Sequence, residues 1–468
     1  MRSIVWFRGK DLRITDHEPL VAAASAGEVL PLFVLDPYFF APERARELPH
    51  RMQFLLESLR ALAANLEHLG SRLLVVSGRS HEVVPRLAAE WQADQVLAHR
   101  WVEPFGRERD RRVAAALDRD GRALRLFEGA TLLTPGSVRT GQGGPYRVFT
   151  PFARACLARL DLQVPLAAPK TLPPLPPSLV GGTEPIPTLE ELGLQPNPLV
   201  LRGGEKQARL RLRTFVDGPL ADYGSQRDRM DHPGTSRLSV DLKFGTLSVR
   251  SVWQAVVACA GDSSGRFLNE LLWREFSHHL LWEWPTLLEQ PFRPEFQGFP
   301  WRDDPAAWLA WVEGRTGYPV VDAAARQLKA EGFVHNRARM VAASFLTKHL
   351  LQNYQRGEGH YLHWLTDGDW AQNNSGWQWS AGCGCDAQPW FRIFNPVAQG
   401  LRFDPEGGYV KRWLPELAEC PAAFVHAPWK LDPSQRAKLE YPPPIVAHAL
   451  ARERFLETAK GFLGRRSP

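Results

Sequence analysis

Short apolar runs alternate with amphipathic helical stretches over the first 130 residues, and this alternation limits the possible folds more than any other feature. Apolar runs of four to eight residues bounded by turn residues are typical of buried strands. Strands that alternate with helices form a parallel sheet with helices on both faces. We therefore expect an N-terminal α/β domain, a doubly wound, Rossmann-like parallel sheet. The expected strands are Ile4–Phe7, Val29–Leu35, Leu73–Val76, Gln95–Ala98 and Leu124–Phe127, and the expected helices are Arg51–Leu69, His81–Trp91 and Arg107–Asp118.

The sheet carries no standard nucleotide motif. No G-x-G-x-x-G follows the first expected strand, and no G-x-x-x-x-G-K-[ST] occurs anywhere in the chain. A standard dinucleotide or P-loop site is therefore not supported. A ligand can still bind at the carboxyl ends of the strands, where such sheets usually hold one.

The chain changes character after a proline-rich stretch. Residues 165–198 contain ten prolines, which indicates a semi-rigid connection. After residue 200, strand signals fade and helical patterns dominate. We expect an α/β domain over residues 1–131, a Pro-rich linker over 132–200 and an all-α domain over 201–468. The helices expected there are Glu205–Asp217, Val249–Cys259, Phe267–Trp282, Pro305–Gly314, Val320–Glu331, Arg337–Asn353 and Gln435–Leu463.

Composition excludes some classes of protein. No apolar run approaches the roughly 18 residues of a membrane span, and the N-terminus has no apolar signal core. Five irregularly spaced cysteines give no disulfide framework. We therefore expect a bacterial-type cytoplasmic protein. The net charge of +6 permits nucleic-acid binding without demanding it. The 17 tryptophans either fill a helical core or serve as stacking platforms or electron carriers.

Four motifs in the helical half could carry chemistry, although most are weak when taken singly. Gly234–Ser239 combines glycine, hydroxyls and an arginine, which suits either phosphate binding or simple helix capping. Glu270, Trp273 and Arg274 share one helix face, where they could form a salt bridge beside a core indole or contact a base. The segment His335–Met340 contains two arginines, which could bind phosphates or simply face solvent.

The fourth motif is a dense polar and aromatic tract from Asp367 to Pro396. Polar groups in a packed interior need hydrogen-bond partners, and a buried polar ligand could supply them here. The pair Cys383 and Cys385 has no second pair of cysteines nearby, so we predict no metal.

Taken together, these motifs resemble the photolyase/cryptochrome family, most closely the class I-type cyclobutane pyrimidine dimer (CPD) photolyases. The resemblance begins at Trp6–Arg13 and continues through Arg315–Asp322 to the tract that ends at Pro396. The motifs occur in the family's order and cover nearly the whole chain. Their joint specificity is therefore high.

The resemblance implies that the helical domain binds FAD. Asn373 matches the residue that faces flavin N5, and the hydroxyl turn matches the phosphate-binding segment. The residues expected to hold the cofactor are Tyr223, Thr235, Ser236, Arg237, Leu238, Ser239, Phe267, Glu270, Arg274, Arg339, Asp367, Gly368, Asp369 and Asn373.

The resemblance also implies light-driven repair of UV-damaged DNA. Photoexcited reduced FAD would give an electron to a flipped-out pyrimidine dimer, whose ring opens before the electron returns. The expected lesion and DNA contacts are Arg227, Glu270, Trp273, Asn336, Arg337, Arg339, Met340, Trp379 and Gln399. Asn336 stands where relatives that repair the (6-4) photoproduct carry a second histidine, which favours cyclobutane dimers. A blue-light receptor cryptochrome is the alternative, and a (6-4) photolyase is a less favoured one.

Three residues match the family's electron relay for flavin photoreduction. Trp377 matches its first member and Trp301 its surface member, but the middle position is Tyr354 instead of tryptophan. Oxidised tyrosine normally sheds its phenolic proton, so a hop through Tyr354 would be slower or proton-coupled. Electrons could instead use Trp370, Trp390 or another nearby indole, with Tyr354 as a packing replacement.

The family also suggests a second, antenna chromophore. The stretch Arg100–Arg107 lies at the carboxyl end of an expected strand, which is a sensible place for one. It lacks an Asn-Glu pair associated with folate binding, which favours FMN or a deazaflavin, or an empty site, over folate. We expect a monomer acting on double- or single-stranded DNA.

Overall fold

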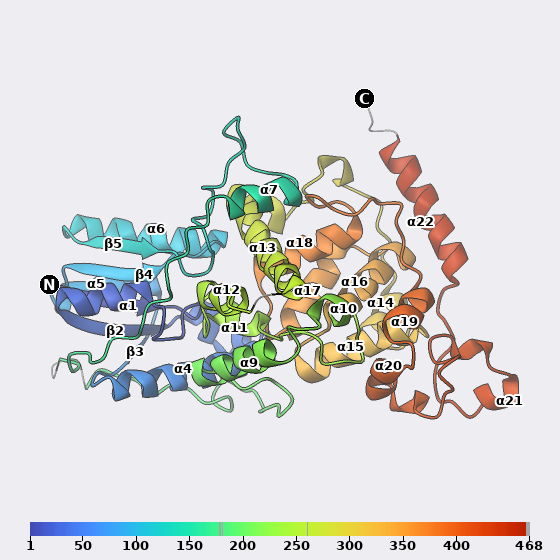
Figure 1. The fold of residues 1–468 in the computed structure, drawn as a ribbon, viewed down its shortest axis with the longest axis horizontal. Coiled ribbons are helices and arrows are strands. Elements are labelled where there is room, and N and C mark those ends of the chain that lie inside the picture. Colours follow the sequence, from blue (N-terminus) through green and yellow to red (C-terminus); the bar gives the residue numbers. More distant parts are fainter. Residues whose placement is uncertain (177–178, 180, 260, 465–468) are drawn as a thin grey trace. The chain divides into compact units, whose positions relative to one another are not determined.

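The computed structural model describes residues 1–176, 179, 181–259 and 261–464, which form two compact units (Figure 1). Unit 1 comprises Met1–Ala221, Ser236–Pro285 and Thr366–Gly368. Unit 2 comprises Asp222–Thr235, Thr286–Leu365 and Asp369–Pro468. These units do not follow the boundaries expected at residues 131 and 200, because residues 236–285 cluster with the α/β part of the chain.

Unit 1 is built on a five-stranded parallel sheet with strand order β3-β2-β1-β4-β5. The strands are β1 (Arg2–Phe7), β2 (Glu28–Leu35), β3 (Leu74–Ser77), β4 (Gln95–His99) and β5 (Ala123–Phe127). The central strand β1 is buried on both faces, which explains its continuous apolar run. The expected α/β class and all five expected strands are confirmed.

Alternate side chains of β1 pack into two separate cores. Val5 and Phe7 pack with the apolar face of α4, whereas Ile4 and Trp6 pack with α5 and α6. This is the two-residue period of a strand covered on both sides. The helices of unit 1 are α1 (Glu18–Ala26), α2 (Pro37–Phe40), α3 (Pro42–Arg46), α4 (Pro49–His68), α5 (Ser80–Glu90), α6 (Pro104–Arg119), α7 (Phe149–Leu157), α9 (Glu205–Asp217), α11 (Ser239–Phe244), α12 (Val249–Val257) and α13 (Asp262–Glu283).

The segment expected to be a linker contains α7, which packs against α13. Phe149 stacks on Trp273 with ring centroids 3.6 Å apart, and Phe152 lies 5.0 Å from Phe276. The buried carboxylate of Glu275 accepts backbone N–H groups from Leu132 and Leu133 at 2.9 and 3.0 Å. The C-terminal part of this "linker" is proline-rich, but its first part is an integral piece of unit 1.

Unit 2 is helical around one large apolar core. Its elements are α10 (Tyr223–Gln226), η1 (Pro285–Leu288), η2 (Pro294–Phe296), α14 (Pro305–Val312), α15 (Pro319–Glu331), α16 (Asn336–Ser344), η3 (Phe345–His349), α17 (Tyr354–Trp364), α18 (Trp370–Ala381), α19 (Pro396–Phe403), α20 (Gly408–Trp413), η4 (Pro415–Leu417), η5 (Pro428–Lys430), α21 (Pro433–Arg436) and α22 (His448–Leu463). Within the described residues, no helix has both the length and the hydropathy that a membrane crossing needs.

Two expected helices of unit 2 need correction. A single helix over Gln435–Leu463 is wrong: α21 ends at Arg436 and α22 begins at His448. Residues 442–444 are three prolines, which lack N–H donors and cannot continue a helix. The helix expected over Arg337–Asn353 passes into the π-helical turn η3 at Phe345, and Leu351 beyond it has a left-handed φ of 58°.

The Arg315–Asp322 motif is a structural turn that starts α15. Asp322 is fully buried, and its carboxylate accepts the backbone N–H groups of Thr316 and Gly317 at 2.8 and 3.0 Å. A Cβ at Gly317 would lie 2.3 Å from the carbonyl oxygen of Pro443, so only glycine fits there. The family motif is therefore explained at this point by backbone geometry.

Candidate functional site

The hydroxyl turn has a backbone that few residues tolerate. Arg237 has a left-handed φ of 52°, uncommon for a residue with a side chain. In unit 1, Ser236 Oγ accepts the N–H of Leu238 at 3.3 Å. In unit 2, a Cβ at Gly234 would lie 2.7 Å from Cβ of Gln226. The close approach requires glycine, so the motif is more than a simple helix cap.

Within unit 1, the turn is tied to the start of the polar tract. The hydroxyl of Ser239 donates to the carboxylate of Asp367 at 2.6 Å. The carbonyl of Gly368 accepts from the Arg51 guanidinium at 3.4 Å. The neighbouring hydroxyl of Thr366 is buried without a hydrogen-bond partner among the described residues. A pair of hydroxyls and a carboxylate in this setting fits a phosphorylated, hydroxyl-rich ligand such as FAD.

The rest of the polar tract belongs to unit 2. Asp369 is buried, and its carboxylate caps α18 by accepting the N–H of Gln372 at 3.1 Å. One turn on, Nδ2 of Asn373 donates to the carbonyl of Glu358 at 3.2 Å, which orients the Asn373 amide. Burial raises the pKa of Glu358 to about 7, although its carboxyl accepts a hydrogen bond from Asn374. Asn373 is therefore held by a neighbouring helix.

On α13, the three residues of the expected face have different surroundings. Trp273 is half-buried, and the Phe149 ring that covers it is nearly parallel, with an interplanar angle of 8°. Arg274 is buried and donates to the carbonyls of Ala130 and Leu242, so its guanidinium also serves the packing of unit 1. Phe267 packs on Phe215 with centroids 4.7 Å apart. Glu270, the third residue of the face, is half-buried.

The expected lesion-contacting pair on α16 lies together. Nδ2 of the exposed Asn336 approaches Sδ of Met340 at 3.7 Å. Arg337 is paired with Asp228 at 2.9 Å and lies over the Phe403 ring. The remaining expected contacts of unit 2 take these positions: Arg339 donates to the Val334 carbonyl at 2.7 Å, Arg227 lies 5.5 Å from the Tyr223 ring, and Trp379 and Gln399 are half-buried.

The relay residues lie in and around the core of unit 2. Trp377 is 3% exposed and packs so closely on Gly357 that a Cβ there would lie 2.3 Å from its ring. The rings of Trp301 and Tyr354 are 6.4 Å apart between centroids. The Tyr354 hydroxyl is buried and has no hydrogen-bond partner among the described residues. Burial raises the pKa of this phenol far above its usual value.

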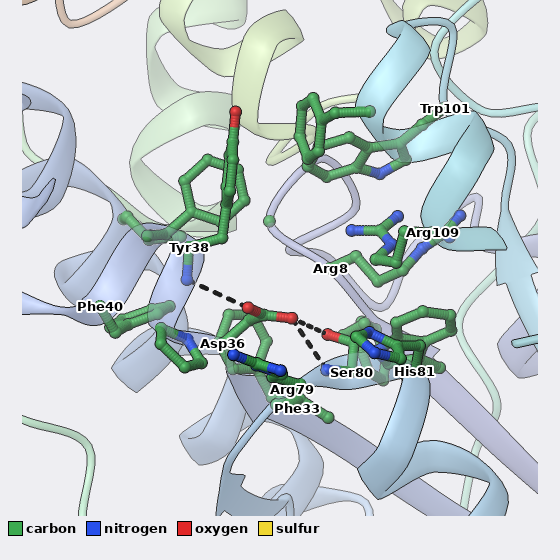
Figure 2. Close-up of a pocket in the computed structure, with 18 of the residues that line it drawn as sticks. Arg8, Phe33, Asp36, Tyr38, Phe40, Arg79, Ser80, His81, Trp101 and Arg109 are labelled. Atoms are coloured by element: carbon green, nitrogen blue, oxygen red, sulfur yellow. Dashed lines mark hydrogen bonds between the residues drawn. The ribbon is translucent and has the colours of Figure 1, made fainter. Parts of the chain in front are cut away.

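A pocket of about 630 Å³ opens at the carboxyl ends of β1 and β2 in unit 1 (Figure 2). Asp36 lies in the pocket lining, where its carboxylate accepts the backbone N–H of Tyr38 at 3.1 Å and the N–H and hydroxyl of Ser80 at 2.9 and 2.6 Å (Figure 2). One carboxylate thereby caps α2 and also accepts the N–H of the first residue of α5, and both helices contribute residues to the pocket lining. The volume suits a cofactor-sized ligand.

Aromatic and cationic side chains line this pocket. Tyr38 and Phe105 stack with centroids 4.7 Å apart, and Trp101 meets Phe105 edge-on at 5.4 Å. The Arg8 and Arg109 guanidiniums lie over the Trp6 ring at 4.7 and 4.9 Å. Burial lowers the pKa of Arg109 to about 10, which still leaves it charged at neutral pH. A planar ring with an anionic tail would match this lining.

Sequence reasoning found only part of the pocket. The stretch Arg100–Arg107 supplies Trp101 and Phe105, but Tyr38, Phe39 and Arg79 were missed. Their signal was present: the aromatic run 38–40 follows a strand directly, at the edge of the sheet where ligands bind.

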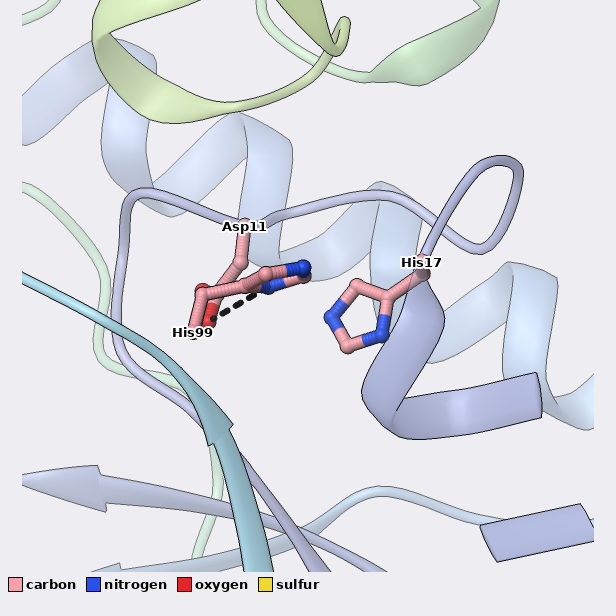
Figure 3. A group of neighbouring side chains, drawn as sticks. All are labelled: Asp11, His17 and His99. Atoms are coloured by element: carbon pink, nitrogen blue, oxygen red, sulfur yellow. Dashed lines mark ion pairs between the residues drawn. The ribbon is translucent and has the colours of Figure 1, made fainter. Parts of the chain in front are cut away.

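A buried trio of Asp11, His17 and His99 also lies in unit 1 (Figure 3). Its possible ligand atoms lie within 4.8 Å of one another, a spacing that could hold a metal. However, Nδ1 of His17 accepts the N–H of Leu20 at 3.1 Å, so the neutral ring carries its proton on Nε2. Nδ1 of His99 faces the Asp11 carboxylate at 3.7 Å, and burial lowers the pKa of both imidazoles. This proton arrangement withdraws His17 as a ligand, and we assign no metal to the trio.

Comparisons with known proteins show the family of the chain. Residues 3–174 match the family model described as DNA photolyase, and residues 267–461 match the FAD binding domain of DNA photolyase. The chain is 44% identical over 415 residues to a deoxyribodipyrimidine photo-lyase of Thermus thermophilus, covering 88% of this chain and 92% of that protein.

Two solved structures are also similar. A bacterial class III photolyase from Agrobacterium tumefaciens has a TM-score of 0.91 and 37% identity, covering 100% of this chain and 98% of that one. An archaeal photolyase from Sulfolobus tokodaii, solved with two FAD molecules, has a TM-score of 0.86 and 30% identity, covering 98% of this chain and 100% of that one. The chain therefore belongs to the DNA photolyase family and carries that family's FAD-binding domain.

Proposed function

We propose that this protein is a deoxyribodipyrimidine photo-lyase, a carbon–carbon lyase that uses light to split cyclobutane pyrimidine dimers in DNA. The observation that carries the proposal is the α13 face, where the half-buried Trp273 has one surface fixed by Phe149 and lies one helical turn from Glu270. An indole backed in this way is a rigid stacking platform, and the carboxyl beside it can accept hydrogen bonds from a pyrimidine edge.

The chain's own residues would bind and position the cofactor and the lesion, and they would not transfer protons. Bound FAD supplies the photochemistry, a one-electron exchange with the lesion. Ser239 and Asp367 would hold its phosphate and ribityl side, together with Tyr223, Thr235, Ser236, Arg237, Leu238, Phe267, Arg274, Arg339, Gly368 and Asp369. Asn373, oriented by its bond to Glu358, would hydrogen-bond the flavin ring edge.

Extrusion of the dimer from the helix costs a few kcal/mol, and least where pairing is already damaged. Stacking on an aromatic side chain returns about 1–3 kcal/mol per base, which is enough to offset much of that cost. Trp273 and Trp379 would supply the stacking, with Asn336 and Met340 beside the lesion and Arg227, Arg337 and Gln399 toward the phosphates. We further propose that the protein acts as a cytoplasmic monomer on double- or single-stranded DNA.

We also propose that the pocket of unit 1 binds an antenna chromophore. Its stacked Tyr38 and Phe105 suit a planar ring, and its arginines suit a phosphate. FMN or a phosphorylated deazaflavin fits this chemistry better than folate does.

The function is tested by illuminating chemically reduced protein with oligonucleotides that carry either a cyclobutane dimer or a (6-4) photoproduct. We expect thymines to be restored only from the cyclobutane substrate. Loss of a hydrogen bond to a charged group costs about 1.5–3 kcal/mol, so Glu270→Ala should lower the repair yield about tenfold or more. FAD should stay bound, because Glu270 is only one of many residues expected to hold the cofactor.

The control variant is Asn269→Ala, because Asn269 is the exposed neighbour of Glu270 on α13. Repair by this variant should match that of the unaltered protein. Lesion binding without repair in the unaltered protein would point to a cryptochrome instead. Repair of only the (6-4) substrate would also refute the proposal.

A further inference from the structure

Two free cysteines lie on the turn that directly follows α18. Cys383 is buried, Cys385 is half-buried, and the chain bends at Gly384 between them. Residues two apart have Cα atoms at most about 7 Å from each other even in an extended chain, and a bend brings them closer. A disulfide needs a Cα separation of roughly 4.4–6.8 Å. The two thiols can therefore pair with only a local movement of the backbone.

This turn is wrapped around one carbonyl oxygen of α18. The carbonyl of Gln378 accepts the N–H groups of Gly382, Cys383 and Gly384 at 3.0, 3.1 and 3.1 Å, and Sγ of Cys383 lies 3.8 Å from the same oxygen. A Cβ at Gly384 would lie 2.9 Å from Cβ of Gln378 and 3.1 Å from the backbone nitrogen of Trp379. The turn has no spare room here, so a change of its shape must displace the backbone at Trp379.

Both ends of the turn are anchored. The carbonyl of Cys383 accepts the N–H of Arg293 at 2.9 Å, and Nε2 of Gln388 donates to the carbonyl of Ser380 at 3.0 Å. Between these anchors, Asp386 has a left-handed φ of 48°, which is uncommon for a residue with a side chain. A rearrangement of the cysteines is therefore confined to a few residues that contact the end of α18.

A buried lysine faces the inner cysteine. Lys348 on η3 is completely buried, and its Nζ donates to the carbonyl of Arg392 at 2.7 Å. Burial lowers the pKa of Lys348 to about 7, so a neutral amine is available at neutral pH. Burial raises the pKa of the Cys383 thiol, and the charge of Lys348 opposes this rise. A buried thiol alone is inert, but Lys348 can take up its proton.

We propose that Cys383 and Cys385 form a reversible redox switch, which hydrogen peroxide closes to a disulfide and which acts on lesion binding through Trp379. The half-buried Cys385 sulfur attacks one peroxide oxygen: an S–O bond forms, the O–O bond breaks, and the leaving hydroxide takes up the thiol proton as water. The Cys383 sulfur then attacks the sulfenic acid, the S–S bond forms and the S–O bond breaks. The second hydroxide leaves as water with the proton that Lys348 took from Cys383. The two thiols lose two electrons and two protons in total, and one peroxide becomes two waters.

The disulfide changes the surroundings of Trp379. It draws the Cys383 sulfur away from the Gln378 carbonyl and shifts Gly384, which already touches the Trp379 backbone. Trp379 is one of the two stacking platforms in the proposed function, and the effect on lesion binding rests on that proposal. A disulfide in so small a ring is strained, and small thiols reduce such bonds readily. The switch therefore reopens when the oxidant is gone.

The first test is chemical and uses the FAD-loaded protein before and after hydrogen peroxide, with free thiols alkylated before digestion by trypsin. The tryptic peptide of residues 357–392 contains Cys383 and Cys385 and no other cysteine. We expect peroxide to leave this peptide unalkylated and lighter by two hydrogen atoms, and dithiothreitol to reverse the change. Two alkyl groups, a sulfinic acid on Cys385, or a disulfide to another peptide would each overturn the proposal.

The second test measures binding of an oligonucleotide with a cyclobutane dimer in the dark, by fluorescence anisotropy, with the flavin oxidised throughout. Peroxide should weaken the affinity about fivefold or more, the loss expected when one stacking platform moves. Cys385→Ser should bind equally well before and after peroxide. Cys259→Ser is the matched control, because Cys259 is a half-buried cysteine of unit 1, and this variant should keep the full response.

Two results would contradict the effect on binding. A disulfide with unchanged affinity would show that the turn does not act on Trp379. A loss of affinity that persists in Cys385→Ser would place the oxidation elsewhere, for example at Met340. The peptide measurement needs neither light nor DNA, so a reduced protein that fails to bind the lesion would count against the proposed function, and the disulfide would still be decided by the peptide mass.

Discussion

At the scale of single residues, Gly357 shows how closely the core fits around Trp377. A Cβ at Gly357 would lie 2.3 Å from Cη2 of Trp377 and 2.5 Å from a methyl carbon of Leu346. Overpacking of this kind costs typically about 1–3 kcal/mol. We expect Gly357→Ala to lower the free energy of unfolding by about that amount, measured by urea denaturation.

The same helix provides the control for that prediction. Gly359 is exposed on α17, and a Cβ there meets no described atom within 4 Å. Gly359→Ala should therefore raise the free energy of unfolding by up to about 1 kcal/mol, because alanine is the better helix former. Equal destabilisation by the two substitutions would contradict the packing account.

Residue identities could suggest a candidate site but not the contacts within it. The run Asp367–Asn373 predicts a ligand site, because so many polar groups need hydrogen-bond partners. The isolation of the Tyr354 hydroxyl and the contact between the Trp311 and Trp377 rings could not be recognised from sequence. Both depend on how α14, α17 and α18 pack against one another, and this packing produces no pattern within a single stretch of sequence.

At the scale of elements, the strands of the sheet could be predicted from the spacing of apolar residues. The pocket could not, because it depends on segments that follow the strands and have no regular spacing. Asp36 caps α2 and α5 together, and each cap is worth roughly 0.5–2 kcal/mol. We expect Asp36→Ala to lower the free energy of unfolding by about 1–3 kcal/mol. It should also weaken FMN binding to the unit 1 pocket, where we propose an antenna chromophore, because α2 and α5 both line this pocket and lose a shared anchor. Fluorescence titration measures this affinity.

Two variants sharpen the Asp36 prediction. Asp36→Asn keeps one acceptor oxygen and should fall between the alanine variant and the unaltered protein. Asp118 is exposed on α6, and Asp118→Ala should change stability by less than about 0.5 kcal/mol and leave FMN binding intact. Undiminished FMN affinity in a folded Asp36→Ala protein would show that the two caps do not shape the pocket.

At the scale of the whole molecule, the sequence suggested consecutive domains, but the chain is interleaved. Composition changes near residue 200 because helices replace strands, yet α9 and α11–α13 join the compact unit that contains the sheet. The local pattern of apolar and polar residues indicates whether a segment is a helix or a strand, but it does not indicate which other element that segment packs against. A boundary drawn from composition therefore cuts through unit 1.

This interleaving predicts that residues 201–468 do not fold alone. Glu275 is fully buried and takes its backbone partners from Leu132 and Leu133, while α7 covers Trp273. Removing the partner of a buried charge costs about 3–5 kcal/mol, a large part of a typical domain's stability. We expect the fragment to lack a cooperative thermal transition by near-ultraviolet circular dichroism, to lose FAD, and to regain both when residues 1–200 are supplied in the same cell. Cleavage of the folded full chain at the exposed turn between Gly141 and Gln142 is the control, because it breaks the backbone and leaves these contacts in place. A fragment 201–468 that binds FAD and melts cooperatively on its own would show that α13 is stable without the first half of the chain.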